Sequence, residues 1–364
     1  MLSRSVRTLL ISTLGIALAV GGSAFGSTAT ATAAPAAAAD PVTGVQVLAA
    51  EGANSGLALG DLHWRDGKVY AVRTSTEPMD IAEYPASGPT ASAPTRQTVV
   101  PGEWGAGGTW WQGDLPAFEV APDGSFYVRA PFRNESTDPA LGWGVGHLQT
   151  DGTMTPTEVP PAGQTYTGEL AGASESIVMD PDGSGLIIGG ARQKSFGGSG
   201  GTSYGVAAEI PLPLPADQQA GAELIASADG WDPNDSATYH KPPFLPGNGV
   251  DVRTLANLGT ILDVDAKGPY IYLRESWFIH RVDRRTNEIT TICCRQPAGW
   301  DEPPLVEGGA VMDAHIELQA GPVADREGNL FVAVGQAHQA GGGPAEIWEI
   351  RNDATLHKVA GQAA

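Results

Sequence analysis

The sequence feature that most constrains the fold is a short unit that recurs five times: an apolar strand, a tight turn ending in glycine, and a second apolar strand. Gly adopts the positive φ of a tight hairpin turn, Asp tolerates it, and the flanking β-branched and aromatic residues favour strands. Three of the turns contain Asp-Gly, and the other two contain Lys-Gly and Glu-Gly. The five predicted hairpins span 61–72, 118–128, 177–188, 261–273 and 322–333.

The later units each continue with two more predicted strands. These strands cover 277–283 and 288–293 in the fourth unit, and 345–350 and 355–361 in the fifth. Four antiparallel strands per repeat form one blade of a propeller. The turn glycines are spaced 57, 59, 85 and 60 residues apart, and the longest step holds an inserted loop near 229–252. We therefore predict an all-β fold, a β-propeller of five recognisable four-stranded blades. Segment 42–50 either closes the ring or belongs to a degenerate sixth blade.

The composition supports a sheet fold over a helical one. The chain has 48 Gly and 28 Pro among its 364 residues, and both residue types interrupt helices. Hydrophobic residues make up 41% of the chain, which is enough for a buried core and argues against general disorder. The formal net charge of −20 repels phosphate backbones and anionic lipid surfaces, so no nucleic-acid partner is expected.

The first 39 residues have the pattern of an export signal. Arg4 and Arg7 precede an apolar run, 9–20, that is too short to span a bilayer. Two Ala-x-Ala sites, ending at Ala33 and Ala39, each suit cleavage. We expect residues 1–39 to be removed. Residues 40–364 would then form the propeller domain of a secreted, extracellular monomer that does not insert into a membrane.

The blade pattern resembles that of the NHL-repeat β-propellers, best over residues 255–361. The resemblance is carried by 288–292 before a Gly-containing connector, by 313–318 leading into the next blade, and by 359–361 at its end. The earlier blades match by their hairpin pattern only. The resemblance implies a propeller used as a binding platform. In related six-bladed propellers it also implies calcium-dependent lactonases and a metal-dependent lyase.

Acidic residues on or just before the predicted innermost strands are the candidates for a metal site. They are Asp61, Glu119, Glu175 and Asp263. Carboxylates that converge on one channel mouth could hold Ca²⁺, which takes six to eight oxygen ligands, and the related lactonases have such a site. The alternative is that these acids are solvated channel or loop residues. Segment 180–184 resembles the opening of a calcium loop, but we interpret it as a hairpin turn because it lacks the closing acid.

Cys293 and Cys294 are the only cysteines, and they are adjacent. In the oxidising space outside the cell we predict that they form a vicinal disulfide, which could line part of a ligand pocket. Two reduced thiols or intermolecular pairing are the alternatives.

Several tryptophans fall in predicted connectors rather than strands, and aromatic residues grouped on one face often form recognition surfaces, including platforms for sugars. The candidate ligand-binding residues are Trp104, Trp110, Trp111, Trp143 and Trp231. Packing between blades is the alternative. Residues 197–201 match the G-x-S-x-G pattern of a nucleophile elbow, but we interpret the Gly/Ser-rich segment 195–203 as a flexible linker.

These observations favour a secreted, noncatalytic binding or scaffold module whose ligand is an extracellular polymer, protein or small molecule. A Ca²⁺-dependent hydrolase or lyase of the lactonase type, with its site at the channel mouth, is the alternative function. Ca²⁺ is the only cofactor that the sequence suggests.

Overall fold

The structure is a computed structural model, and we describe the residues whose placement it defines. They are 59–66, 68–73, 80–85, 94–100, 103–104, 108–109, 117–134, 141–155, 176–196, 200–215, 221–226, 249–254, 258–259, 261–275, 278–294, 305–314, 316, 318–334 and 346–360. The predicted export signal, 1–39, and segment 42–50 lie outside these residues. The chain divides into two compact units, 1–100 and 101–364.

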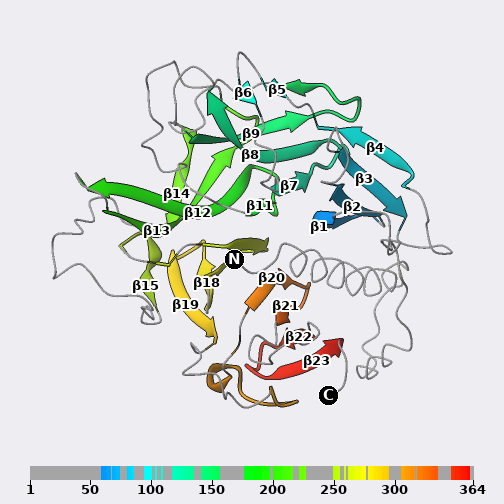
Figure 1. The fold of residues 1–364 in the computed structure, drawn as a ribbon. Helices are drawn as coiled ribbons and strands as arrows, with labels where there is room; N and C mark the ends of the chain where they lie inside the picture. Colours follow the sequence, from blue (N-terminus) through cyan, green and yellow to red (C-terminus); the bar gives the residue numbers. More distant parts are fainter. Residues whose placement is uncertain are drawn as a thin grey trace. The chain divides into compact units, whose positions relative to one another are not determined.

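The first unit contains one antiparallel sheet of four strands in sequential order (Figure 1). Glu83 on its third strand is buried, and its carboxylate lies 2.9 Å from Lys68 Nζ and 3.1 Å from Arg96 Nη2. These two cations come from the neighbouring strands, so one buried acid joins three of the four strands. The strands are β1 (Leu59–Arg65), β2 (Lys68–Arg73), β3 (Asp80–Pro85) and β4 (Arg96–Val99).

The second unit contains four antiparallel sheets. Sheet two has β5 (Glu103–Trp104), β6 (Gly108–Thr109), β7 (Ala117–Val120), β8 (Phe126–Asn134), β9 (Leu141–Leu148) and β10 (Met154–Thr155). Sheet three has β11 (Ser176–Met179), β12 (Gly185–Phe196), β13 (Gly200–Pro211) and β14 (Glu223–Ala226). Sheet four has β15 (Val250–Asp251), β16 (Asp263–Lys267), β17 (Tyr270–Arg274), β18 (Ile279–Asp283) and β19 (Glu288–Cys293). Sheet five has β20 (Leu318–Ala324), β21 (Leu330–Val334), β22 (Glu346–Ile350) and β23 (Leu356–Ala360).

These five sheets confirm the predicted all-β fold with five blades, although sheet two has six strands and sheet four has five rather than the predicted four. All five predicted hairpins are present, as β1–β2, β7–β8, β11–β12, β16–β17 and β20–β21. Helical structure in the described residues consists of two 3₁₀ turns, Val252–Thr254 and Val311–Asp313, and the single helical residue Gly221. No helix among these residues is long and apolar enough to cross a membrane.

The turns form as their residues predict. Gly124 and Gly183 have φ values of 82° and 77°, in the left-handed region that glycine reaches without strain. In the first of these turns Asp123 Oδ1 accepts the backbone N–H of Ser125 at 2.9 Å. In the second, Asp182 Oδ1 accepts that of Ser184 at 2.8 Å. A local Asx turn therefore supports each hairpin.

Within the second unit the innermost strands follow one another in space, with contacts between β7 and β11, β11 and β16, and β16 and β20. Apolar clusters fill the seams between these blades. Ile177 and Val145 belong to the cluster between sheets two and three, Ile187 and Val264 to the next, and Ile279 and Leu318 to the last. The core therefore lies between blades, and each blade is buried by its neighbours.

One prediction about a connecting segment was wrong. Residues 195–196 and 200–203 are not a linker but continue β12 and β13, with Phe196 paired to Gly200. The β12–β13 pairing begins at Gly185, ten residues before the Gly/Ser-rich segment, and continues through it despite the local composition. The end of the insertion near 229–252 is a strand, β15, which adds a fifth strand to sheet four by pairing with β19.

Candidate functional site

Glu119, a predicted metal ligand on β7, is used to join two blades. Glu119 is only 8% exposed. One carboxylate oxygen accepts the N–H of Val120 at 2.8 Å, and the other accepts the N–H of Met179 on β11 at 3.2 Å. A carboxylate that satisfies a buried backbone N–H of the next blade has a structural role.

Asp263, a second predicted ligand, begins β16. Its Oδ1 accepts the N–H of Val264 at 3.1 Å, and its Oδ2 lies 3.8 Å from Arg274 Nη2. The side chains of the other two candidates, Asp61 and Glu175, lie outside the described residues. Among the residues that the structure describes, no three His, Cys, Asp or Glu side chains gather as metal ligands would. The calcium site stays a prediction.

Asp265, two residues further along β16, was missed by the sequence analysis. Its Oδ2 accepts the N–H of Ala324 on β20 at 2.6 Å, and its Oδ1 accepts the N–H of Ala266 at 2.8 Å. Burial raises the pKa of Asp265 to about 7, and the negative charge of Asp263 acts in the same direction, although the two backbone N–H groups oppose the shift. The alternation of Asp263 and Asp265 along one strand is a signal that could have indicated a shared face.

A third polar residue joins the remaining seam. The hydroxyl of Ser176 on β11 accepts the N–H of Val264 at 3.0 Å and lies 3.3 Å from the carbonyl oxygen of the same residue. All three seams between neighbouring inner strands of the second unit are therefore crossed by a side-chain hydrogen bond to backbone. We call Glu119, Ser176 and Asp265 the seam residues.

The turn at 180–184 is a hairpin turn, as predicted. The carboxylate of Asp180 is almost fully buried and pairs with the guanidinium of Arg284, from the β18–β19 turn. The same guanidinium lies 2.7 Å from Glu209 Oε2 on β13. Burial raises the pKa of Glu209, and the Asp180 charge adds to this while Arg284 opposes it. Arg284 of sheet four therefore pairs with two carboxylates of sheet three, those of Asp180 and Glu209.

The predicted disulfide between Cys293 and Cys294 is present. Both residues are fully buried. They belong to the apolar cluster between sheets four and five, together with Ile279 and Val311. The suggestion that this bond lines a ligand pocket was wrong, because the sulfur atoms pack in the core.

Two of the candidate ligand-binding tryptophans lie on an extension of sheet two. β7 pairs only with the first part of β8, up to Arg129, while β8 continues to Asn134 along β9 and β6. Trp143 on β9 pairs with Pro131, and Trp104 on β5 pairs with Gly108, the partner of Asn134. The other candidates, Trp110, Trp111 and Trp231, lie outside the described residues.

A buried chain of hydroxyl, imidazole and carboxylate lies in sheet four. His280 is fully buried, with Nδ1 3.0 Å from Thr291 Oγ1 and Nε2 3.2 Å from Glu275 Oε1. His280 lies in a predicted strand, as expected, but its partners Thr291 and Glu275 were not predicted. The signal was available, because His280 and Thr291 lie symmetrically about the turn between two predicted strands.

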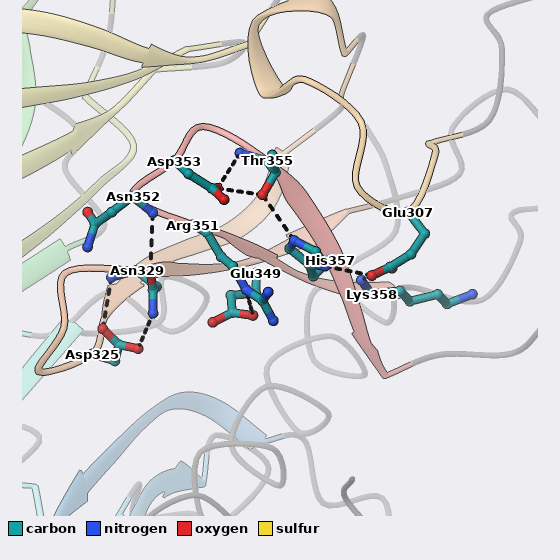
Figure 2. A network of polar contacts seen from close by, with 10 residues as sticks. All are labelled: Glu307, Asp325, Asn329, Glu349, Arg351, Asn352, Asp353, Thr355, His357 and Lys358. Atoms are coloured by element: carbon teal, nitrogen blue, oxygen red, sulfur yellow. Dashed lines mark hydrogen bonds and ion pairs between the residues drawn. The ribbon is translucent and has the colours of Figure 1, made fainter. Parts of the chain in front are cut away.

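A related but exposed network lies in sheet five and is shown in Figure 2. Thr355 Oγ1 donates to Asp353 Oδ1 and lies 3.0 Å from His357 Nε2, while His357 Nδ1 lies 2.6 Å from Glu307 Oε1. The N–H of Lys358 and the His357 side chain lower the pKa of Glu307. In sheet two, the Ser125 hydroxyl is similarly hydrogen-bonded to both Asp123 and His147. Both networks support turns.

Comparisons with known proteins leave the family open. No family model matches the chain, so the NHL resemblance gains no support beyond the propeller fold. No curated protein matches it either.

Solved structures align with this chain only at low identity and low TM-score. One, from a study of two prolyl endopeptidases, has 10% identity and a TM-score of 0.39, covering 85% of this chain and 37% of its own. A xylan β-1,4-xylosidase from Bacillus halodurans C-125 has 12% identity and a TM-score of 0.38, with 83% and 55% coverage. An endo-1,4-β-xylanase from Bacteroides thetaiotaomicron VPI-5482 has 12% identity and a TM-score of 0.35, with 83% and 93% coverage. This chain thus spans less than two thirds of the first two. Likeness at this level carries no functional assignment.

Proposed function

We propose that this chain is a secreted β-propeller that binds an extracellular ligand on the extension of sheet two. The observation that supports this is the strand register, which brings Trp104 and Trp143 onto one small sheet beyond the end of the blade's innermost strand. Tryptophan combines a large apolar face with one N–H donor, so it suits ligands that have both apolar faces and hydrogen-bonding groups.

The ligand class we propose is a neutral polysaccharide. The faces of sugar rings offer C–H groups that stack on indole, and the register places one tryptophan on each face of this small sheet. The net charge of −20 repels anionic polymers over the Debye length, which disfavours them as ligands. The inner-strand acids Glu119 and Asp265 already accept backbone N–H groups, which favours the binding function over a calcium-dependent one.

The test is depletion of the mature protein, residues 40–364, from solution by insoluble neutral polysaccharides. We expect Trp104→Ala and Trp143→Ala each to weaken binding by about tenfold or more, as removal of an aromatic anchor does. Trp348→Phe is the matched control, because Trp348 is buried in sheet five and should leave binding unchanged. Binding that survives both alanine substitutions, or that prefers anionic polymers, would refute the proposal.

Secretion has its own test. The full-length chain expressed in a secreting host should appear in the medium with its N-terminus at Ala34 or Asp40, read by N-terminal sequencing. Retention of the intact chain in the membrane fraction would contradict the export proposal.

A further inference from the structure

We propose that Thr291, His280 and Glu275 form a metal-independent acyl-transfer site that hydrolyses esters, an activity beyond ligand binding. The three side chains form a continuous chain of hydrogen bonds, 3.0 Å from the Thr291 hydroxyl to His280 and 3.2 Å from His280 to Glu275. A nucleophile within reach of a base, with the base held by a third group, is the arrangement that activates a hydroxyl.

In such a site the base and the carboxylate are buried and the nucleophile is accessible, and the exposures of the three residues agree with this. His280 is fully buried and Glu275 is 5% exposed, whereas Thr291 is partly exposed. A buried carboxylate keeps the imidazole in one tautomer, with the proton on Nε2 and the lone pair of Nδ1 directed at the hydroxyl. Thr291 is the most exposed residue of the three, so we place the approach of a substrate at this residue.

The backbone around the site fixes these side chains. Ile279 pairs with Cys293 but His280 pairs with Thr291, so Ile292 is an extra residue in β19, a bulge. Paired residues share a sheet face, so the bulge directs Thr291 to the face of His280 and Cys293 to the face of Ile279, where the disulfide is buried. Bulges often re-aim side chains next to active sites.

Glu275 is held from two sides. Its N–H donates to the carbonyl of Phe278 at 2.9 Å, which closes the connection between β17 and β18. On the other side lies Gly259, where a Cβ atom would come within 2.6 Å of Glu275 Oε2. The glycine therefore lets the connector before β16 lie directly on the carboxylate, and Glu275 acts as a positioning residue.

Two other hydroxyl–imidazole pairs in the described part of the chain lack this arrangement. Thr355 donates its hydroxyl proton to Asp353 rather than to His357, and the Glu307 side chain beyond that histidine is 63% exposed (Figure 2). Ser125 is buried and its hydroxyl also meets an aspartate, Asp123. A hydroxyl whose proton is held by a carboxylate outside the histidine is not activated by that histidine.

These three residues can support the hydrolysis of an ester through an acyl-threonine intermediate. Thr291 Oγ attacks the ester carbonyl, and its proton passes to Nδ1 of His280 while Glu275 stabilises the imidazolium. Collapse of the tetrahedral intermediate breaks the C–O bond, and the leaving alkoxide takes the proton from His280. Water then attacks the acyl-threonine by the same proton route and releases the acid.

The test uses the mature protein, residues 40–364, with a fluorophosphonate probe and p-nitrophenyl butyrate. We expect one covalent adduct, located on Thr291 by peptide mass spectrometry. Thr291→Val keeps the shape of the side chain and should abolish the adduct and lower ester hydrolysis by about 10²–10⁴-fold. Thr291→Ser should retain both.

The matched control is Thr355→Val, which removes the hydroxyl of the network in sheet five and should leave labelling and hydrolysis unchanged. His280→Gln should abolish labelling. If that variant does not fold, Thr291→Val, checked by its melting temperature, decides the question. No adduct on Thr291, or hydrolysis that persists in Thr291→Val, would overturn the proposal. Neither result bears on polysaccharide binding, which involves sheet two.

Discussion

Asp265 gives the protein an unusual dependence of stability on pH. Its carboxylate accepts the Ala324 N–H across the seam between sheets four and five, and burial raises its pKa to about 7 from the ordinary 3.8. The folded state therefore holds a proton that the unfolded chain has released between these two pH values. Stability from this group is highest at low pH and falls as pH rises from about 4 to about 7.

The size of the effect follows from the two pKa values. A difference between 3.8 and about 7, at about 1.4 kcal/mol for each tenfold change in proton affinity, amounts to about 4 kcal/mol. Asp265 keeps part of its surface exposed, so this figure is an upper bound, and we expect about 2–4 kcal/mol.

The assay is urea unfolding of the mature protein between pH 4.5 and pH 8, compared with Asp265→Asn. The asparagine cannot ionise, so the free energy of unfolding of the variant should fall less steeply over this range. Asp182→Asn, at an exposed turn, is the control and should follow the wild-type curve. Parallel curves for the wild type and Asp265→Asn would refute the reasoning, since the carboxyl would then titrate equally in both states.

Three further predictions concern the second unit. The double variant Cys293→Ala/Cys294→Ala should lose about 1–3 kcal/mol of unfolding free energy because it empties buried volume. Thiol labelling of the native, unreduced protein should find no free cysteine, and two labelled thiols would contradict the disulfide. Arg284→Met should cost about 1–3 kcal/mol at pH 7, because it leaves Asp180 buried without its cation. That cost should shrink as the pH is lowered, because burial raises the pKa of Glu209 and this carboxylate takes up a proton earlier than an exposed glutamate does, and a loss independent of pH would argue against the charge explanation. Addition of calcium or of a chelator should shift the melting temperature by less than about 2 °C, measured by calorimetry, whereas a larger shift would support the predicted calcium site.

The sequence predicts the hairpins well because their determinants are local. Asp and Gly at 123–124 and 182–183 specify turns within a few residues, and the strands that flank them follow. The hydrogen bonds that close the seams were not predictable in this way. Ser176 and Val264 are 88 residues apart, and their contact depends on how whole blades align.

The candidate site was predicted only in part for the same reason. The disulfide needs nothing but adjacency and was found, while the Thr291–His280 pair needs the register of one hairpin and could have been found. The bulge at Ile292 could not, because no Gly or Pro marks it in the sequence. The insertion near 229–252 gave no sign that its end, β15, would join sheet four.

The seam residues also determine where this chain can be cut. Glu119, Ser176 and Asp265 each satisfy a backbone N–H that belongs to the following blade. A fragment that ends between two of these blades would remove one partner of a seam hydrogen bond and leave the other partner, a donor or an acceptor, unpaired. Each orphan costs about 1–3 kcal/mol, a large part of the total stability of a domain. Truncation or blade exchange inside 117–324 should therefore yield insoluble chains, whereas insertions at the tip between β12 and β13, beyond every seam, should be tolerated.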